Sequence, residues 1–207
     1  MADEHTRTKG LGSTAGGTLD FYARNAGSYA AGSRGNARLR GFLQFLPAGS
    51  LILELGTGSG IDARTMLDLG YRVDPTDGSP ELAAEAEKRL GRPVRRMLFS
   101  ELDAEKRYDG VYACASLLHA DRRDLPDLIA RIHLALKAGG VVWASFKGGE
   151  REGCDSLGRY FNYLGPGELE ALWRSSGDWS DIRVESWSGS AYDGVATDWH
   201  AILARKR

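Results

Sequence analysis

Three alternating glycines, Gly56, Gly58 and Gly60, have a spacing that indicates ligand chemistry. They follow the apolar run Leu51–Leu55, which is typical of a buried parallel strand, and they precede a helix predicted over residues 61–69. Glycines after a strand let the backbone turn tightly and let a ligand approach without interference from Cβ atoms. The amino end of the helix adds unpaired N–H groups, so this corner predicts a ligand site at the edge of an open α/β sheet.

Two classes of cofactor suit such a corner. A dinucleotide-binding loop has the pattern G-x-G-x-x-G, in which the third glycine lets helix and strand pack closely. Gly56 and Gly58 satisfy this pattern, but its third position falls on Ile61. The chain instead has the pattern E-x-G-x-G-x-G, which begins at Glu54. An ordinary strand-to-helix turn without a ligand is the alternative explanation of these glycines.

Two further side chains with suitable chemistry follow predicted strands. Asp77 follows the strand predicted over residues 71–76, and a carboxylate there can accept hydrogen bonds from both hydroxyls of a ribose. His119 follows the strand predicted over residues 110–114, and an imidazole with a reference pKa of about 6.5 could act there as a general base. The alternatives are a turn-forming aspartate and a structural histidine hydrogen-bonded at the turn.

The remaining patterns supply the elements that must position these residues. Helices are predicted from residue 18 onward and over residues 36–46, 80–90, 125–136 and 166–176. The remaining strands are predicted over residues 94–98, 141–146, 181–187 and 199–204. Residues 1–17 are polar and rich in glycine, threonine and serine, which predicts a disordered lead. Residues 18–207 then form one domain, with a helical cap over residues 18–46 and a lid loop over residues 147–163.

Composition narrows the class of partner. The chain has 207 residues, 42% of them hydrophobic, and a formal net charge of −1, which suits one globular domain and gives no reason to expect a nucleic-acid or membrane partner. The two cysteines, Cys114 and Cys154, lack the spacing of a metal site, so no metal is expected. No secretory signal or membrane-spanning run is visible, which makes the cytoplasm the expected location. The oligomeric state is left open.

Four separated segments match one family. They are Glu54–Gly60, Asp77, Tyr108–Ala113 and Leu136–Gly140. The first resembles motif I of the class I S-adenosylmethionine-dependent methyltransferases. The last two resemble the F-D-x-V and L-K-P-G-G signatures of that family, with Ala138 where proline is usual. Within the family, the chain is most similar to small bacterial methyltransferases of the ubiquinone-biosynthesis and tellurite-resistance type.

This resemblance implies an α/β, Rossmann-like fold with a seven-stranded, mostly parallel sheet, helices on both faces and an antiparallel carboxyl-terminal strand. It implies S-adenosyl-L-methionine as the cofactor and a small molecule as the methyl acceptor. The cofactor-binding residues that it implies are Tyr22, Tyr29, Glu54, Gly56, Thr57, Gly58, Gly60, Asp77, Gly78, Leu98, Phe99, Ala115 and Ser116.

The resemblance also implies roles for these residues. Gly56 and its neighbours would approach the methionine part of the cofactor, and Glu54 would support that loop or meet the amino group. Asp77 would bind the ribose. Leu98 stands where the family often has an acid that reads the adenine amino group, so backbone groups and an apolar slot would hold the adenine instead.

Two tyrosines could cover the cofactor, and three further residues could bind the acceptor. Tyr22 and Tyr29 resemble amino-terminal tyrosines that cover the cofactor in related enzymes, although packing on a helix face explains them equally well. Arg159, Tyr160 and Tyr163 could bind an anionic or aromatic acceptor, or they could anchor the last helix.

Three functions are consistent with these observations. The first is a small-molecule methyltransferase, in which the protein mainly aligns the acceptor and excludes water, and in which His119 is the candidate general base. The second is a nicotinamide-dependent oxidoreductase that uses the same corner. Ile61 and the Leu136–Gly140 signature argue against it. The third is a non-catalytic module that binds S-adenosylmethionine.

Overall fold

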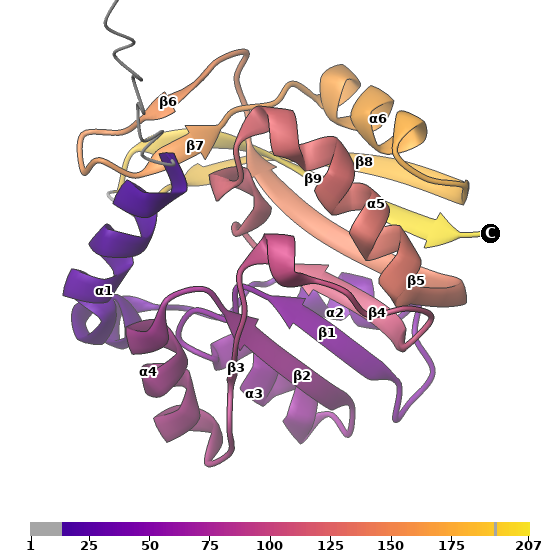
Figure 1. Cartoon of the computed structure of the whole chain (residues 1–207), viewed down its shortest axis with the longest axis horizontal. Helices are drawn as coiled ribbons and strands as arrows, with labels where there is room; N and C mark the ends of the chain where they lie inside the picture. The colour runs from indigo at the N-terminus through magenta and orange to yellow at the C-terminus, as the bar shows by residue number, and fades with distance from the viewer. Residues whose placement is uncertain (1–13, 193) are drawn as a thin grey trace, which may run out of the picture.

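The computed structural model describes residues 14–192 and 194–207. These residues fold around one central seven-stranded sheet (Figure 1). The strand order is β3-β2-β1-β4-β5-β9-β8. The strands of this sheet are β1 (Leu51–Leu55), β2 (Arg72–Asp77), β3 (Arg95–Arg96), β4 (Tyr108–Ala113), β5 (Leu136–Lys147), β8 (Trp179–Ser190) and β9 (Ala196–Lys206).

Pairing directions give the sheet its mixed character. β1 pairs in parallel with β2 and β4, β2 with β3, and β4 with β5. The last strand, β9, runs antiparallel to both β5 and β8. The expected seven-stranded, mostly parallel α/β sheet with an antiparallel carboxyl-terminal strand is therefore confirmed.

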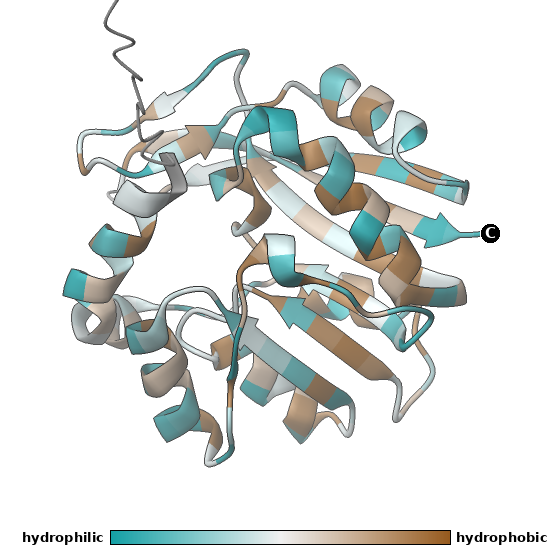
Figure 2. Cartoon of the chain, in the orientation of Figure 1, coloured by the Kyte–Doolittle hydropathy of each residue, from teal (hydrophilic) through white to brown (hydrophobic). Residues whose placement is uncertain are grey.

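Helices cover both faces of the sheet and divide the core in two. On one face lie α2 (Leu39–Leu43), α3 (Ile61–Asp68) and α4 (Pro80–Leu90), whose buried side chains pack with those of the strands. On the other lie α5 (Leu125–Ala135) and α6 (Pro166–Ser175). Figure 2 shows hydrophobic residues along the central strands and mixed character on the helices, as expected for helices that bury one side only.

The amino-terminal helix α1 (Thr14–Gly32) stands apart from these layers and packs against α4 (Figure 1). It begins four residues before the predicted start at Thr18, so residues 14–17 of the expected disordered lead are helical. Residues 1–13 of that lead lie outside the described residues. Thr18 therefore lies inside the helix, and its hydroxyl accepts a hydrogen bond of 2.9 Å from the Tyr160 N–H of a distant segment.

The segment predicted as a lid loop over residues 147–163 is mostly ordered structure. Lys147 ends β5, and a two-stranded antiparallel hairpin follows, with β6 (Glu152–Cys154) paired to β7 (Tyr160–Asn162). The Asp155 carboxylate closes the turn by accepting the N–H groups of Leu157 and Arg159. The predicted lid loop therefore contains regular structure over residues 152–162, which we call the hairpin, and its role as a lid stays a prediction.

Two predicted elements are shorter than expected. The helix predicted over residues 36–46 is helical only in α2, because Asn36 donates its N–H to Asp62 and its side-chain amide to Tyr112. The strand predicted over residues 94–98 is reduced to β3. The backbone leaves the sheet after β3, where the Leu98 N–H donates a hydrogen bond of 2.7 Å to the Glu101 carboxylate. At each of these two boundaries, a side-chain carboxylate accepts a backbone N–H, that of Asp62 ahead of α2 and that of Glu101 after β3.

Candidate functional site

A cavity of about 700 Å³ lies where β1, β2 and β4 end, with α1 as one wall. It brings together most residues that the sequence singled out for a site. Those that line it are Tyr22, Tyr29, Gly56, Gly58, Asp77, Gly78, Leu98, Phe99, Ala115, Ser116 and His119. The other candidates do not line it, and they are Glu54, Thr57, Gly60, Arg159, Tyr160 and Tyr163.

The loop after β1 approaches the end of β4 very closely at Gly56. A Cβ atom placed on Gly56 would lie 2.6 Å from the Ser116 Cβ, and the glycine has φ +76°. Ser116 is held in turn by a hydrogen bond of 2.6 Å from its hydroxyl to the Leu55 carbonyl. Only a residue without a side chain fits here, so the glycine permits the contact that shapes this end of the cavity.

Glu54 lies beneath this loop rather than in the cavity. Its side chain is buried, and it accepts a hydrogen bond of 2.5 Å from the Thr57 hydroxyl. Burial raises the pKa of the Glu54 carboxyl to about 8, although the Thr57 hydrogen bond partly opposes that shift. Of the two expected roles, contact with the loop is therefore the one that the geometry shows.

Gly60 also faces away from the cavity. It begins α3 with φ +75°, and a Cβ atom on it would lie 3.1 Å from the Ala86 Cβ of α4. Its lack of a side chain therefore allows α3 and α4 to pack closely. The three alternating glycines have different surroundings, because only Gly56 and Gly58 line the cavity.

Asp77 ends β2 at the floor of the cavity. Its carboxylate accepts hydrogen bonds from the N–H groups of Gly58, at 2.8 Å, and Ser79, at 2.9 Å. Burial raises the pKa of the Asp77 carboxyl to about 6, with the two N–H donors opposing the shift. Each carboxylate oxygen has about two acceptor sites, so one on each remains for a ligand hydroxyl.

Beyond Asp77, the cavity wall is hydrocarbon. A Cβ atom on Gly78 would lie 3.2 Å from the Leu98 side chain and 3.3 Å from the Leu19 side chain, so these two leucines close over the chain beside Asp77. Leu82 and Met97 continue the same wall. This arrangement matches the apolar slot expected after the third strand.

The end of β4 forms the opposite wall. Ala115 has φ +49°, a conformation that costs a non-glycine residue roughly 1–2 kcal/mol, and its N–H donates to the Ser145 hydroxyl at 2.8 Å. Cys114 lines the cavity, is half-buried and packs against the core. Burial raises the pKa of the Cys114 thiol to about 12, so this thiol is uncharged at neutral pH.

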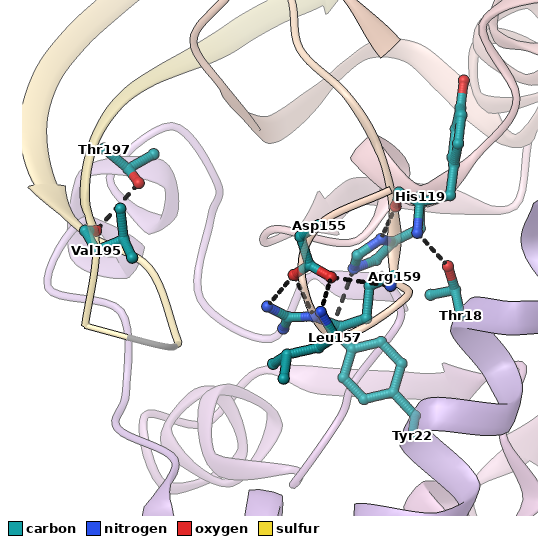
Figure 3. Close-up of polar contacts among 9 residues, drawn as sticks. Thr18, Tyr22, His119, Asp155, Leu157, Arg159, Val195 and Thr197 are labelled. Carbon is teal, nitrogen blue, oxygen red and sulfur yellow. Dashed lines mark hydrogen bonds and ion pairs between the residues drawn. The ribbon is translucent and has the colours of Figure 1, made fainter. Parts of the chain in front are cut away.

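His119 and Tyr22 form a pair at the cavity (Figure 3). The His119 Nδ1 lies 2.6 Å from the Tyr160 carbonyl oxygen, which can only accept, so Nδ1 carries the proton. Nε2 is therefore unprotonated, and its lone pair accepts a hydrogen bond of 3.0 Å from the Tyr22 hydroxyl. Burial lowers the pKa of His119 to about 4 and raises that of Tyr22 to about 12, so both side chains are neutral near pH 7.

The three residues predicted at the acceptor have structural contacts within the protein, and a role at the acceptor stays a prediction for them. The Arg159 guanidinium pairs with Asp155 at 2.6 Å (Figure 3). It also lies over the rings of Phe21 and Phe161, each at 5.0 Å. The Tyr160 hydroxyl bonds to Glu152 within the hairpin, and Tyr163 packs against the core. The contact between Arg159 and Phe21 joins the hairpin to α1.

Sequence reasoning missed one side of the cavity, formed by η3 (Arg122–Asp124) and the first turns of α5. Its charged members are paired with one another. Arg131 bonds to Asp127 at 2.7 Å, and Arg123 lies 3.5 Å from Asp121 and 3.6 Å from Asp124. Only the position of this segment after the fourth strand could have indicated that it lines the site.

The same fold recurs in solved structures. The 1,6-didemethyltoxoflavin-N1-methyltransferase of Burkholderia thailandensis, solved with 1,6-didemethyltoxoflavin and S-adenosylhomocysteine, is 23% identical, with a TM-score of 0.74 over 100% of this chain and 92% of that one. The phosphoethanolamine N-methyltransferase 2 of Haemonchus contortus, solved with S-adenosyl-L-methionine, is 20% identical, with a TM-score of 0.66 over 97% of this chain and 58% of that one. The [4+2]-cyclase SpnF is 15% identical, with a TM-score of 0.69 over 94% of this chain and 97% of that one.

A family model supports the classification. Residues 52–140 match the model described as a methyltransferase domain, and they hold the Gly loop, Asp77 and the end of β4. These residues are similar to a methyltransferase domain, and they make up less than half of the chain. The expected resemblance to the S-adenosylmethionine-dependent methyltransferases is supported by this match and by the solved structures, whereas the resemblance to the ubiquinone-biosynthesis and tellurite-resistance type stays a prediction. A comparison of the sequence with curated proteins gave no match.

The two other sequence signatures, around Asp109 and Lys137, have a structural role in the fold. The Asp109 carboxylate accepts hydrogen bonds from the Leu51 N–H, at 2.8 Å, and the Lys137 ammonium, at 2.6 Å. The Y-D-G-V and L-K-A-G-G segments therefore meet at the start of β1, at the edge of the sheet away from the cavity. They hold the central strands in place at that end of the sheet.

Other classes of site have no support in the described part of the chain. Within residues 14–192 and 194–207, no three side chains of the metal-binding types come together, and no helix is long and apolar enough to cross a membrane. The comparisons support neither the nicotinamide-dependent oxidoreductase nor the non-catalytic binding module.

Proposed function

We propose that this chain transfers a methyl group from S-adenosylmethionine to a small, uncharged acceptor that carries an N–H or O–H group. The observation that carries the proposal is that His119 Nε2 presents its lone pair at the same cavity as the Gly loop and Asp77. A cofactor in the loop and an acceptor at His119 would then share one cavity. This proposal retains the sequence-based roles of Gly56 and Asp77.

The proposed cofactor position follows the cavity from end to end. The methionine part would lie between Gly56 and Ser116, the ribose hydroxyls would donate to Asp77, and the adenine would lie against Leu98. S-adenosylmethionine supplies the electrophilic methyl group, and the protein must hold the acceptor atom in line with the bond that breaks. Tyr29 also lines the cavity and would cover the cofactor from α1.

His119 would hold the acceptor rather than remove its proton early. With its pKa lowered to about 4 by burial, the imidazole is neutral near pH 7 and is a weak base. Its Nε2 would accept a hydrogen bond from the acceptor's N–H or O–H in place of the Tyr22 hydroxyl. The Tyr160 carbonyl fixes the ring and its tautomer, so the lone pair keeps its direction.

The charges of the cavity favour a neutral acceptor over an anionic one. Both guanidinium groups among its described lining residues, those of Arg123 and Arg131, are paired with aspartates. The Arg159 guanidinium lies outside the cavity and is paired with Asp155. The Burkholderia enzyme, which by its name methylates N1 of 1,6-didemethyltoxoflavin, supports an acceptor nitrogen as one form of this class.

Calorimetric titration with S-adenosylhomocysteine tests the cofactor part of the proposal. We expect binding by the wild-type chain and a loss of about 10- to 100-fold in Asp77→Ala, because a charge-assisted hydrogen bond is worth roughly 1.5–3 kcal/mol. Asp74→Ala is the matched control, because Asp74 lies on the same strand but bonds to Tyr108 and Arg95. No binding by the folded wild-type chain would contradict the proposal.

Transfer of labelled methyl groups to a panel of small molecules tests the acceptor part. We expect turnover with uncharged N–H or O–H heteroaromatic compounds and none with their phosphorylated forms. His119→Ala should raise KM for the acceptor and leave S-adenosylhomocysteine affinity within about threefold, since the lost hydrogen bond is to the acceptor alone. Preference for the phosphorylated compounds would overturn the proposed acceptor class.

A further inference from the structure

The end of the cavity beyond Asp77 is apolar and open to solvent. Leu98, which forms its wall with Leu19 and Met97, has a relative exposure of 43%, a large value for a leucine at a binding site. Ser100, next along the lining, is also exposed. This end is therefore a hydrocarbon slot that leads to the surface and is not closed by a wall.

The chemistry of adenosine determines what would point toward this opening. If the ribose lies at Asp77, as the proposed function requires, the purine enters the slot between Leu98 and Leu82. The exocyclic amine of adenine is on the edge of the purine opposite the glycosidic bond. The amine therefore points away from Asp77, toward Ser100 and the first turns of α5.

Two of the polar groups near that edge are already bonded to the protein. The Leu98 N–H donates to the Glu101 carboxylate at 2.7 Å. Across the opening, Asp127 is paired with Arg131 at 2.7 Å, and its side chain is 70% exposed. A solvent-exposed carboxylate that is already paired adds little recognition, because water competes for it. The Ser100 hydroxyl is exposed to water in the same way, so recognition of the adenine in this slot would depend mainly on shape and apolar contact.

We propose that this site does not read the exocyclic amine of the adenine and that it accepts adenosyl cofactors substituted on that nitrogen. Leu98 is the residue that determines this tolerance, because its side chain lines the path along which a substituent would leave the cavity. The inference rests on the proposed cofactor position and adds a statement about which cofactor analogues fit. It concerns binding alone and needs no knowledge of the acceptor.

Two analogues of S-adenosylhomocysteine separate the two parts of the proposal. N6,N6-dimethyl-S-adenosylhomocysteine has no N–H to donate, so it tests whether the amine is read. N6-benzyl-S-adenosylhomocysteine carries a bulky group, so it tests whether the slot is open. With the full wild-type chain in calorimetry, we expect both to bind within about fivefold of S-adenosylhomocysteine, since neither loses a hydrogen bond or meets a wall.

Two variants complete the test. Leu98→Asp places a carboxylate beside the amine at an exposed position, and we expect it to bind the dimethyl analogue at least about tenfold more weakly than S-adenosylhomocysteine. Asp127→Ala should leave the affinity of S-adenosylhomocysteine unchanged. A tenfold loss in Asp127→Ala would show that Asp127 reads the amine and would overturn the proposal.

The remaining outcomes are equally decisive. A wild-type loss of about 30-fold or more for either analogue overturns the inference while the proposed function stands, because S-adenosylhomocysteine itself still binds. Absence of discrimination in Leu98→Asp would place the amine elsewhere and overturn it too. Failure of the folded wild-type chain to bind S-adenosylhomocysteine would overturn the proposed function and this inference together.

Discussion

At the scale of single residues, Glu54 illustrates how a buried acid serves a binding loop without contacting a ligand. Its carboxyl lies under the Gly loop, 3% exposed, with the Thr57 hydroxyl as its donor. Burial raises its pKa from 4.5 to about 8, so the folded chain holds a proton here that an unfolded chain releases at neutral pH. That difference makes stability depend on pH.

The sign of this dependence can be predicted. Because the folded-state pKa is above the unfolded one, the neutral carboxyl favours the folded state at low pH, and stability declines as pH rises from 4.5 through about 8. Glu54→Gln removes this decline while keeping an oxygen for Thr57. We expect the variant to gain on the order of 3–5 kcal/mol over the wild type at pH 9 and little at pH 4.

Urea unfolding of both proteins between pH 4 and pH 9 measures this difference. Other titrating groups, such as Asp77, are present in both proteins and cancel in the comparison. A free-energy difference between Glu54→Gln and the wild type that stays constant across this range would show that Glu54 does not titrate as described.

At the scale of elements, the loop between β1 and α3 has two glycines that are needed for different close contacts. Gly56 makes room for Ser116 at the cavity, whereas Gly60 makes room for Ala86 between two helices. Both have positive φ, so an alanine at either position is strained. Their consequences should therefore be alike for stability and different for binding.

Alanine substitutions separate these two demands. We expect Gly56→Ala and Gly60→Ala each to lower the free energy of unfolding by roughly 1–3 kcal/mol, because each adds strain and a close contact. Only Gly56→Ala should also abolish binding of S-adenosylhomocysteine. Gly70→Ala, with φ +84° and open space around the new Cβ, is the control for strain alone. Normal binding by Gly56→Ala would remove the central place given to this glycine.

At the scale of the whole molecule, α1, the end of β4 and the hairpin are joined around the cavity. Thr18 accepts from the Tyr160 N–H, the Tyr160 carbonyl accepts from His119, and His119 accepts from Tyr22 (Figure 3). Arg159 adds ring contacts to Phe21 and, at 5.4 Å, to Tyr192 beyond the end of β8. Three segments far apart in the sequence thus share one set of contacts, which suggests that they respond together to a ligand.

We propose that α1 and the hairpin close over bound cofactor and acceptor. Hydrogen exchange with and without S-adenosylhomocysteine should then show protection over residues 18–32 and 147–163 as well as over the Gly loop, because a ligand that binds the closed form suppresses opening. Protection confined to residues 51–80 and 95–120 would contradict closure and leave the cofactor site unaffected.

Local patterns in the sequence were sufficient for the sheet and for the ligand corner. The apolar run Leu51–Leu55, the glycines after it and Asp77 each act through the backbone next to them, so their spacing predicts their placement. The signature around Asp109 and Lys137 indicated the family, although its structural reason, an ion pair of 2.6 Å, is visible only in the fold.

Tertiary structure alone decided the surroundings of the candidate residues. No local pattern shows that Gly60 faces α4, that Arg159 pairs with Asp155 outside the cavity, or that residues 152–162 form a hairpin. The tautomer of His119 depends on the Tyr160 carbonyl, 41 residues away in the chain. The sequence by itself determined which elements form and where their ends meet, because backbone periodicity and local turns are short-range. Burial, pairing and protonation are set by neighbours distant in sequence, so only the folded chain could assign them.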